Sequence, residues 1–523
     1  KVQVLQQGEK VRGYEAASQA FILEEGTSQV LNFMISSVSQ DLQPQAPLKR
    51  LKRIVSRRIL KTSTDVNAVI AASQRRWQGL LTLFPEVEEE YRAKFRHSQE
   101  VLIRNTLAPQ PEVDYGKRMR GNRGTFPARG FYEAFWIWDA AFSAQGLKEW
   151  DARLAKENIR LVLANQREDG GLVFLTPNSA VPSAQPPLLS WAAMSIYQQD
   201  FDKTFLEEVY PRLKSWNAWW FKNRDQNHNG LCEWKDALES GWDNSPRWDR
   251  GTSHLEAVDL NAFLLLDMKM LELMARLLGQ TEEAREWQDR AGTLGRKIWE
   301  VFYDKDRNLF FDADKEDYQQ KQRILTPASF LPLWAGVPLS LDETTLLRIF
   351  GPEGVPARYR AAQRDAGDME PLVKDMIQRY LLNPDYFFGN CPFPSVAYRE
   401  PSYEPGFYWR GPVWLNLAYF MMDTLYKYGF IVEADEAAQR ILRMVNAHPH
   451  IYEYYNSQTG CRGEGPKDAN IPAAQDFSWS AALIILMLLG RFNTFEGMRL
   501  FNEPVVPAAR QVRSAHRSRR AGA

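Results

Sequence analysis

Residues 239–249 read Glu-Ser-Gly-Trp-Asp-Asn-Ser-Pro-Arg-Trp-Asp, a segment that places three carboxylates among two tryptophans and an arginine. Its glycine, serines and proline are typical of a loop rather than of the middle of a helix. Asp243 directly follows Trp242, and a carboxyl group against an apolar ring loses solvation, which favours its neutral form. We therefore interpret Asp243 as a proton donor that works near neutral pH. The alternative is a loop with a buried tryptophan and solvated charges.

Helical periodicity surrounds this loop on both sides. From about residue 65 to residue 492, apolar residues recur at three- and four-residue intervals. The sequence lacks the strand–helix alternation of a parallel sheet and has no Gly-rich phosphate loop. Many paired helices with long loops predict an all-α toroid whose helix ends share one face. The predicted helices include 151–165, 186–198, 203–222, 254–278, 282–303, 411–428, 433–446 and 476–491.

The two ends of the chain differ from this helical region. Residues 1–62 contain β-prone runs at 21–23 and 30–35, separated by a turn signal, and predict a short β-rich segment, the remnant of a β-sandwich. Residues 63–119 are predicted to be a helical linker and residues 120–495 the catalytic toroid. Residues 496–523 form a basic tail that we expect to be disordered.

Composition restricts the partners of the chain. Lys plus Arg and Asp plus Glu balance at 65 each, so no global field attracts nucleic acid or a membrane, and a neutral substrate is favoured. Cysteines at 232, 391 and 461 are too few and too scattered for a disulfide scaffold. The sequence shows no apolar run long enough for a membrane span and no signal peptide, so a cytoplasmic location is expected. Nothing in the sequence indicates the oligomeric state.

A second candidate carboxylate lies 210 positions after the first. Residues 451–465 read Ile-Tyr-Glu-Tyr-Tyr-Asn-Ser-Gln-Thr-Gly-Cys-Arg-Gly-Glu-Gly, with Glu453 between two tyrosines and Glu464 nearby. Hydrolysis of a glycosidic bond requires two carboxylates, one to protonate the leaving oxygen and one to act on water or on the sugar. A closed ring of helices would bring Asp243 and Glu453 together. The alternatives are that Glu464 is the second carboxylate, or that Glu453 is an ordinary polar residue.

Three more segments have side chains suited to sugars. Asp139 follows Trp138, so a carboxylate that accepts from hydroxyls lies beside an indole face. Gln185 can donate and accept at once, as a sugar hydroxyl requires. In residues 403–416, Trp409 and Arg410 supply a flat ring and a fork of donors. For each aromatic residue, packing in the core is the alternative.

Residues 225–236 read Asp-Gln-Asn-His-Asn-Gly-Leu-Cys-Glu-Trp-Lys-Asp and have the oxygen spacing of a calcium loop. Oxygen ligands stand at the first, third, fifth and ninth positions, and a glycine stands at the sixth. The twelfth residue is Asp236 rather than the usual glutamate. A structural calcium ion is therefore one interpretation, and a polar turn between helices is the other. The ligands would be Asp225, Asn227, Asn229 and Glu233.

Taken together, these motifs resemble glycoside hydrolases of families 63 and 37, which include processing α-glucosidases, trehalases and mannosylglycerate or glucosylglycerate hydrolases. The resemblance covers about residues 120–492. It is carried by Trp138-Asp139, Gln185-Pro186-Pro187, Glu239-Ser240-Gly241-Trp242-Asp243-Asn244-Ser245, Tyr408-Trp409-Arg410-Gly411-Pro412-Val413-Trp414, Glu453-Tyr454-Tyr455 and Phe477-Ser478-Trp479-Ser480.

The resemblance implies an (α/α)6 barrel and an inverting mechanism that requires no organic cofactor. It implies that Asp243 is the general acid and Glu453 the general base. Residues of the same motifs would hold the sugar, namely Trp138, Asp139, Gln185, Glu239, Trp242, Tyr408, Trp409 and Arg410. The trehalase signature before the barrel is absent, and the mannosylglycerate and glucosylglycerate hydrolases look most similar within the barrel.

The sequence therefore predicts an inverting hydrolase of an α-linked glucoside or mannoside, with a small carbohydrate as its substrate. A trehalase-like hydrolase is one alternative. A second is a sugar-binding barrel without catalysis, against which the presence of both carboxylates argues. A third is a toroidal isoprenoid cyclase, but the Asp-rich motifs that such an enzyme uses are absent from the sequence.

Overall fold

The computed structural model describes residues 2–7, 10–16, 87–109, 114–176, 180–350, 369–465 and 472–492. The chain divides into two units, Lys1–Gly79 and Leu80–Ala523. In the first unit, β1 (Val2–Gln7) and β2 (Lys10–Ala16) pair antiparallel, with Val2 opposite Ala16. The strands predicted at 21–23 and 30–35 and the basic tail lie outside the described residues.

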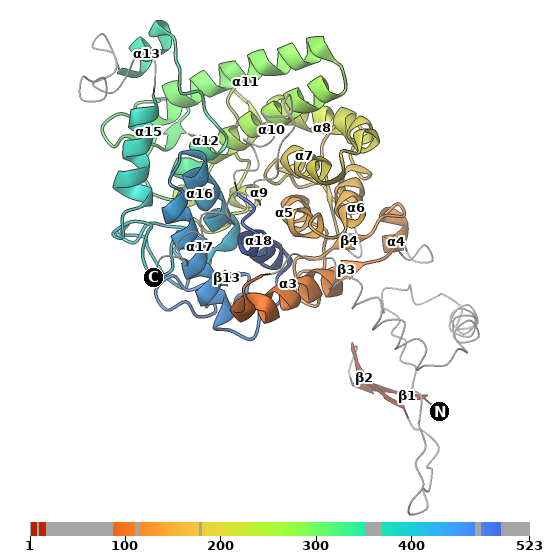
Figure 1. The fold of residues 1–523 in the computed structure, drawn as a ribbon. Helices are drawn as coiled ribbons and strands as arrows, with labels where there is room; N and C mark the ends of the chain where they lie inside the picture. Colours follow the sequence, from red (N-terminus) through yellow and green to blue (C-terminus); the bar gives the residue numbers. More distant parts are fainter. Residues whose placement is uncertain are drawn as a thin grey trace, which may run out of the picture. The chain divides into compact units, whose positions relative to one another are not determined.

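The second unit is mostly helical, and six of its helices form a closed ring. Each of the six contacts the next one along the chain, and the last contacts the first (Figure 1). These inner helices are α5 (Ile137–Leu147), α7 (Leu189–Asp200), α10 (Val258–Leu277), α12 (Leu331–Trp334), α16 (Leu415–Lys427) and α18 (Ser478–Leu488).

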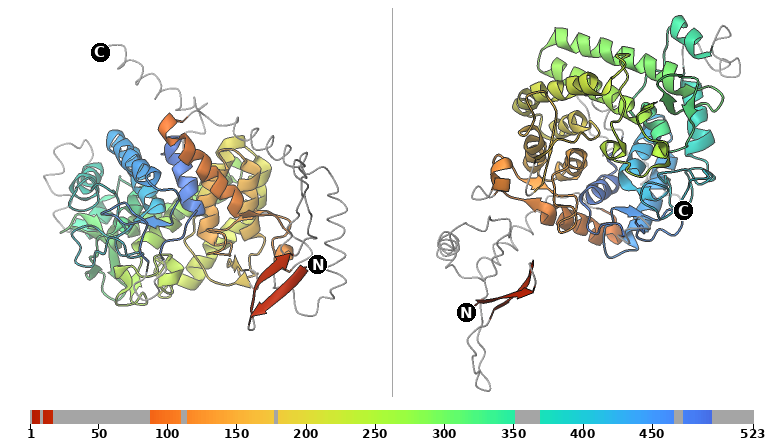
Figure 2. Two further views of the ribbon diagram at one scale, coloured as in Figure 1. Left: turned by 90° about the horizontal axis from the view of Figure 1, so that it is seen from below. Right: turned by 180° about the vertical axis from the view of Figure 1, so that it is seen from behind.

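A second set of helices packs outside the ring, each against an inner helix. They are α6 (Ala152–Leu163) on α5, α8 (Lys203–Arg224) on α7, α11 (Thr281–Phe302) on α10, α17 (Ile431–Asn446) on α16 and α3 (Arg92–Asn105) on α18. Helix α3 comes from the segment predicted as a linker, and Figure 2 shows it in orange beside dark-blue α18.

The sequences of the helices explain which of them are inner and which outer. Every residue of α5 is buried, and so is nearly every residue of α18, because both helices have apolar side chains around their whole circumference and few polar ones between them. Helices α6, α11 and α17 bury one face only and carry charges on the other. Asp151 and Asp202 cap α6 and α8, where their carboxylates accept from the backbone N–H groups of Leu154 and Phe205.

The second unit also contains short helices and 3-10 turns outside these two sets. The remaining helices are α4 (Asp114–Arg118), α9 (Ala237–Ser240), α13 (Glu343–Phe350) and α15 (Glu370–Met376), which continues as a π turn over Ile377–Leu381. Short 3-10 turns occur at Glu89–Tyr91, Pro246–Trp248 and Pro327–Phe330.

Short antiparallel strands tie the loops together. They are β3 (Thr106–Leu107) with β4 (Gly124–Thr125), β5 (Phe174–Leu175) with β6 (Ala180–Val181), β7 (Leu255–Glu256) with β10 (Asp312–Asp314) and β11 (Lys321–Gln322), β8 (Tyr303–Asp304) with β9 (Leu309–Phe310), and β12 (Val413–Trp414) with β13 (Tyr454–Tyr455).

Aromatic rings fill the centre of the ring of helices. Trp334 lies 4.1 Å from Phe420, and Phe142 lies 5.6 Å from Phe420, as measured between ring centroids. Trp191 closes the group, 5.7 Å from Trp334. These side chains come from α12, α16, α5 and α7, so the inner helices are joined by a packed core rather than by an open channel.

The predicted helices are confirmed to within a few residues. The segment predicted as 203–222 is α8 at Lys203–Arg224, and that predicted as 282–303 is α11 at Thr281–Phe302. The largest shifts, four residues each, are at the starts of two helices that follow a short strand. Helix α10 begins at Val258 instead of 254, after strand β7 at Leu255–Glu256, and α16 begins at Leu415 instead of 411, after strand β12 at Val413–Trp414.

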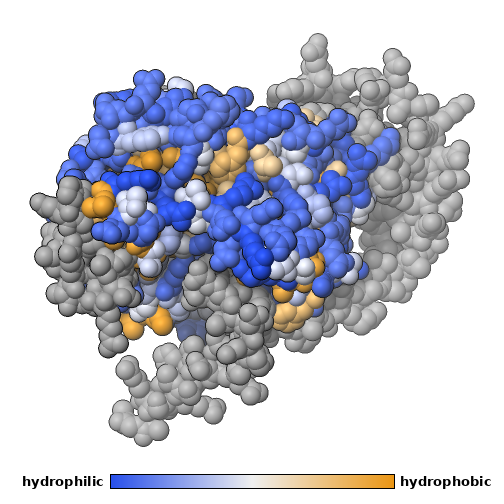
Figure 3. Space-filling view, turned by 90° about the horizontal axis from the view of Figure 1, so that it is seen from above, coloured by the Kyte–Doolittle hydropathy of each residue, from blue (hydrophilic) through white to orange (hydrophobic). Residues whose placement is uncertain are grey.

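The surface agrees with this division of inner and outer residues. Figure 3 shows a face that is mostly hydrophilic, with hydrophobic residues in small separate groups. Among the described helices, none combines the length and apolarity that a membrane crossing would need.

Candidate active site

One cavity, about 360 Å³ in volume, collects residues from the loops that precede the inner helices. Trp138 and Asp139 occupy the first turn of α5, and Gln185 lies just before α7. Residues 408–414 lead into α16, and Phe477 immediately precedes α18. The lining residues are Pro127, Tyr132, Trp136, Trp138, Asp139, Phe174, Val181, Ser183, Gln185, Leu238, Gly241, Asp243, Tyr408, Trp409, Trp414, Glu453, Phe477 and Trp479.

Asp243 lies on the wall of this cavity, between α9 and the 3-10 turn at Pro246–Trp248. Burial raises the pKa of its carboxyl group to about 6, although the Tyr408 hydroxyl opposes this shift by donating to Oδ2 at 3.1 Å. A carboxyl group with that pKa is protonated in about one molecule in ten at pH 7, far more often than a carboxyl group with the ordinary pKa of an aspartate. This is the property predicted from the neighbouring Trp242.

Glu453 lines the same cavity and is almost completely buried. Its backbone N–H donates to the Ala474 carbonyl, while the Ala474 N–H donates to carboxylate Oε2 at 3.0 Å. Burial raises the pKa of Glu453 to about 7; hydrogen bonds from Ala474 and from the Tyr132 hydroxyl lower it, and the charge of Asp243 raises it further. The two carboxyl groups, 210 positions apart, are therefore close enough to influence each other's charge.

Asp139 adds a third carboxyl group to the cavity. Burial raises its pKa well above the ordinary value, and the charge of Glu453 raises it further. Gln185 is fixed beside it because its Oε1 accepts from the backbone N–H of Ile137 at 2.7 Å. The Gln185 amide nitrogen is then the part of that side chain that can donate to a ligand. Both residues line the cavity, and their contact with sugar hydroxyls stays a prediction.

Gly241 is required by the geometry of the loop that carries Asp243. It ends α9 with a φ of +76°, a left-handed conformation that glycine adopts without strain. A Cβ atom at this position would also lie 2.5 Å from Cζ2 of Trp138. Gly241 therefore allows the loop that carries Asp243 to pass directly over the indole of Trp138.

Three residues predicted to hold the sugar are not among those that line the cavity. Glu239 pairs with Arg224 through both carboxylate oxygens, at 2.8 and 2.5 Å. Trp242 lies behind Trp409, with the rings 5.7 Å apart and 16° from parallel. Glu239 and Trp242 therefore support the loop. Their direct contact with a ligand stays a prediction.

Arg410, the third of these residues, joins two loops. Its guanidinium donates to the Asp249 carboxylate at 2.7 and 3.1 Å and to the Asn244 carbonyl at 3.3 Å. The backbone N–H of Trp409 donates to Asn244 Oδ1 at 2.8 Å. Arg410 therefore fixes the residues that flank Asp243.

Sequence reasoning missed several lining residues, among them Tyr132, Trp136, Phe174 and Leu238. Tyr132 and Trp136 stand in the segment that ends in Trp138-Asp139, but nothing in that segment distinguishes them from core aromatics. Leu238 is 66% exposed although it is apolar. An exposed leucine has no signature in a sequence.

The predicted calcium loop is held by its own hydrogen bonds. The Asp225 carboxylate accepts from the backbone N–H groups of Asn229 and Gly230, both at 2.9 Å. Lys315 Nζ donates to one carboxylate oxygen of Glu233 at 2.9 Å. The other oxygen of Glu233 and one oxygen of Glu256 are buried without a hydrogen-bond partner. In the described part of the chain, no three Asp, Glu, His or Cys side chains are grouped to hold a metal by themselves.

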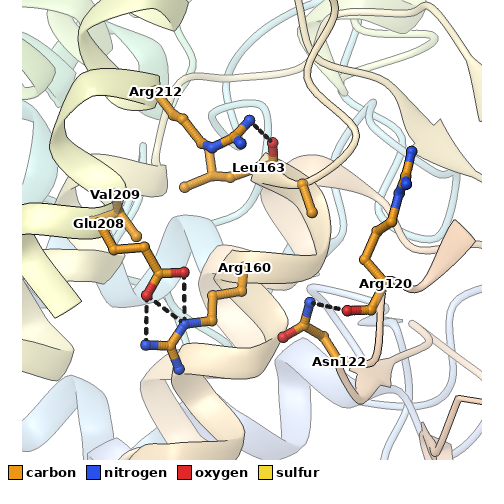
Figure 4. A pocket seen from close by; sticks show the side chains of 8 residues that line it. Arg120, Asn122, Arg160, Leu163, Glu208, Val209 and Arg212 are labelled. Atoms are coloured by element: carbon orange, nitrogen blue, oxygen red, sulfur yellow. Dashed lines mark hydrogen bonds and ion pairs between the residues drawn. The ribbon is translucent and has the colours of Figure 1, made fainter.

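A different cavity, about 270 Å³ in volume, lies between α6 and α8 and shares no residue with the first. Figure 4 shows that three arginines line it, Arg120, Arg160 and Arg212. Arg160 is paired with Glu208, and Arg212 donates to the Leu163 carbonyl. This cavity has cations and no pair of free carboxyl groups, so it lacks the groups needed for acid–base hydrolysis.

Comparison with known proteins identifies the family. The model of the mannosylglycerate hydrolase MGH1-like glycoside hydrolase domain matches residues 132–367 and 365–480. Mannosylglycerate hydrolase of Thermus thermophilus is 26% identical over 450 residues, which cover 70% of this chain and 97% of that protein. Glucosylglycerate hydrolase of Mycolicibacterium hassiacum is 25% identical over 427 residues, 65% of this chain and 91% of that protein.

Solved structures support the same fold. The crystal structure of family 63 mannosylglycerate hydrolase from Thermus thermophilus in complex with glucose has a TM-score of 0.57 and 24% identity, and the match covers 75% of this chain and 99% of that one. Neutral trehalase of Saccharomyces cerevisiae gives a TM-score of 0.53 at 14% identity, covering 75% and 79%. With the family model matched over most of the helical unit, the chain belongs to the MGH1-like family of glycoside hydrolases.

Proposed function

We propose that this chain hydrolyses an α-linked glucoside or mannoside with inversion, in an (α/α)6 barrel that spans about residues 120–495. The observation that carries this proposal is that Asp243 and Glu453 line one cavity and influence each other's ionisation. The ring of paired helices supports the barrel. A relative that acts on mannosylglycerate and one that acts on glucosylglycerate support an α-linked sugar as the substrate.

Asp243 is the general acid of this mechanism. Its proton passes to the glycosidic oxygen as the bond from that oxygen to the anomeric carbon breaks. Glu453 is the general base, and it takes a proton from a water molecule that attacks the anomeric carbon from the opposite face. The products are a free sugar of opposite anomeric configuration and the protonated leaving group. Asp243 then regains a proton and Glu453 loses one, so no cofactor is consumed.

The hydrogen-bond donors in the cavity support this division of roles, although burial leaves the pKa of Glu453, about 7, above that of Asp243, about 6. Glu453 receives donors from the Ala474 N–H and the Tyr132 hydroxyl, and both favour its charged form, which a base needs. Among the side-chain donors described, Asp243 receives only the Tyr408 hydroxyl. Asp139 and Gln185 would accept from and donate to the hydroxyls of the sugar, with Trp138 and Trp409 against its faces.

The test is hydrolysis of a panel of α-glucosides and α-mannosides, with trehalose included. Proton NMR during the first turnovers identifies the anomer that is released. We expect the β anomer first, because attack opposite to an α-linked leaving group inverts the configuration. Release of the α anomer first would overturn the inverting mechanism. Saturable sugar binding without turnover would favour the non-catalytic barrel, and trehalose as the best substrate would favour the trehalase-like alternative.

A structural calcium ion in the 225–236 loop is a second, separate proposal. Its support is the oxygen spacing of Asp225, Asn227, Asn229 and Glu233 and the unpartnered buried oxygen of Glu233. Metal analysis of the purified chain and thermal unfolding with EDTA and then with added Ca²⁺ test it. We expect bound calcium and a lower unfolding temperature in EDTA. A chain that contains no calcium and unfolds at the same temperature in both solutions would reject the proposal.

A further inference from the structure

We propose that the substrate's leaving group is electrically neutral and is held by an apolar rim made of Trp136, Phe174, Val181 and Leu238. This inference rests on the proposed function and specifies its substrate class. It points to a second sugar, an aryl group or an alkyl group as the leaving group. It disfavours a carboxylate-bearing group such as the glycerate named for several relatives.

The rim is built by backbone pairing. Strands β5 and β6 place Phe174 directly opposite Val181, so both side chains lie on the same face of the ribbon. The Phe135 N–H donates to the Leu175 carbonyl at 2.8 Å, which brings the next residue, Trp136, onto this ribbon. The Trp136 and Phe174 rings stack with their centroids 4.1 Å apart. The result is a flat apolar surface at the cavity.

Leu238 contributes to the rim from another element, helix α9, five residues before Asp243. It is 66% exposed, whereas Trp138, Asp139 and Glu453 in the same cavity are each about 4% exposed. Trp136 and Val181 are partly exposed and Phe174 is 9% exposed, so the rim is on average the more open side of the cavity and Leu238 is its most exposed member. The sugar whose bond is broken fits the end with the carboxyl groups, and the leaving group faces the rim.

The charge of the cavity argues against an anionic leaving group. Its lining includes Asp139, Asp243 and Glu453 and, among the described residues, no Lys, Arg or His. Carboxylates repel a like charge, and a carboxylate that lies against an apolar rim loses water on that side without gaining a cation or a donor. Two arginines near the loops of the cavity, Arg410 and Arg462, interact with other protein groups.

Arg410 is paired with Asp249 and Glu404. Arg462 lowers the pKa of Glu453 slightly, but it donates to the Ala473 carbonyl at 2.7 Å and does not line the cavity. Neither arginine is therefore positioned to receive a carboxylate from the leaving group.

The experiment compares three substrates that share one sugar, made for glucose and for mannose. They are the α-glycosyl fluoride, whose small leaving group does not reach the rim, a p-nitrophenyl α-glycoside, and the glycosylglycerate. We expect kcat/KM for the p-nitrophenyl glycoside to exceed that for the glycerate by about tenfold or more. A higher kcat/KM for the glycerate would overturn the inference.

Failure of the proposed function looks different from failure of this inference. If the fluoride itself is not hydrolysed, the catalytic assignment fails. In that case the affinities of the wild-type chain for the p-nitrophenyl glycoside and for the glycosylglycerate, measured by calorimetry, still test the inference. Tighter binding of the neutral ligand supports it, and tighter binding of the glycerate contradicts it.

Variants of the rim test the role of its residues. Leu238→Lys places a cation on the rim and should raise kcat/KM for the glycosylglycerate relative to the p-nitrophenyl glycoside by about tenfold. Leu238→Met keeps the rim neutral, and Val432→Lys adds the same charge at a residue that is 75% exposed and outside the cavity. Both controls should leave that ratio unchanged. An unchanged ratio in Leu238→Lys, or an equal change in Val432→Lys, would place the leaving group elsewhere.

Phe174→Ala removes half of the stacked pair. It should lower kcat/KM for the p-nitrophenyl glycoside more than kcat/KM for the fluoride, because only the former contacts the rim. An equal loss for both substrates would indicate that Phe174 supports the fold of the cavity rather than the leaving group.

Discussion

Trp242, the residue before Asp243, and Tyr454, the residue after Glu453, lie at opposite ends of one stack of aromatic rings. Trp242 stacks on Trp409 with centroids 5.7 Å apart, and Trp409 stacks on Trp414 at 3.6 Å and 5°. Trp414 in turn stacks on Tyr454 at 4.5 Å. The neighbours of both catalytic candidates are thus joined through rigid rings.

This stack explains how two distant segments hold one geometry. Trp414 and Tyr454 are also paired in the backbone, as strands β12 and β13. An inverting hydrolase needs its carboxyl groups about 6.5–9.5 Å apart, with room for one water molecule. Flat rings of fixed thickness are suited to setting such a distance, because they cannot be compressed and have few rotamers.

The first prediction concerns the two carboxyl groups. Asp243→Asn and Glu453→Gln should each lower kcat by roughly 10²–10⁴-fold, because each removes one proton transfer. Circular dichroism should show unchanged folding, since both amides keep the size of the side chain. Glu464→Gln is the matched control: Glu464 accepts from Asn456 at 3.2 Å but does not line the cavity. Loss of activity in Glu464→Gln with activity retained in Glu453→Gln would reassign the base.

The second prediction is the pH dependence. The pKa of Asp243 is raised to about 6 and that of Glu453 to about 7. Activity requires protonated Asp243, which is lost as pH rises, and ionised Glu453, which is lost as pH falls. We therefore expect a bell-shaped profile of kcat/KM with both limbs near neutral pH and a maximum between about 6 and 7. A profile that is flat from about pH 4 to about pH 9 would contradict the assignment of these groups.

The third prediction isolates the Tyr408 hydroxyl. It donates to Asp243 and so favours the charged carboxylate; without it, the pKa of Asp243 rises above its value of about 6. Tyr408→Phe should therefore move the maximum of the profile to higher pH, because protonated Asp243 and ionised Glu453 coexist most at the pH midway between their two pKa values. Tyr380→Phe removes a hydroxyl that donates to the Arg307 carbonyl outside the cavity, and it should leave the maximum in place. A shift of the maximum to lower pH would show that Tyr408 has another role.

Much of this architecture could be predicted from the sequence. The helices were located to within a few residues because long amphipathic or apolar periods identify both a helix and its buried face. Asp243 and Glu453 could be proposed because each stands beside aromatic residues in a Gly-containing loop. Their convergence on one cavity depends on the closed ring of helices, which the whole succession of paired helices predicts and neither loop predicts by itself.

The supporting residues could not be assigned in the same way. Glu239, Trp242 and Arg410 belong to the motifs that carry the family resemblance, yet none of the three lines the cavity. A motif records which residues are needed but does not distinguish contact with a ligand from support of the loop. Conversely, no sequence pattern identifies Phe174 and Leu238 as lining residues. The position of Phe174 depends on the pairing of β5 with β6, and that of Leu238 depends on helix α9.

The fourth prediction concerns Arg247, the buried arginine of the loop that carries Asp243. Arg247 donates to Asp259 at 2.7 and 2.9 Å and to Asp312 at 2.8 and 2.7 Å, and all three side chains are at most 2% exposed. Arg247→Leu leaves two buried carboxylates without a cation and should destabilise the fold by about 3–5 kcal/mol. Arg285→Leu breaks an exposed pair with Glu282 and should cost less than about 1 kcal/mol. The midpoints of urea unfolding should be measured for Arg247→Leu and Arg285→Leu. Equal midpoints would mean that the buried ion pairs of Arg247 do not stabilise the fold.

The final prediction separates strain from contact at Gly241. Gly241→Ala introduces a side chain at φ +76° and a Cβ atom 2.5 Å from Trp138, an indole that lines the cavity. Gly251→Ala, in the same loop region, meets the same backbone strain at φ +86° but has no atom within 4 Å. Both variants should lose about 1 kcal/mol from the left-handed conformation. Only Gly241→Ala should also displace Trp138 and lower kcat/KM by more than about tenfold, through the position of Asp243. If the two variants have the same kcat/KM, the loop tolerates the contact, and the close approach of Gly241 to Trp138 does not position the acid.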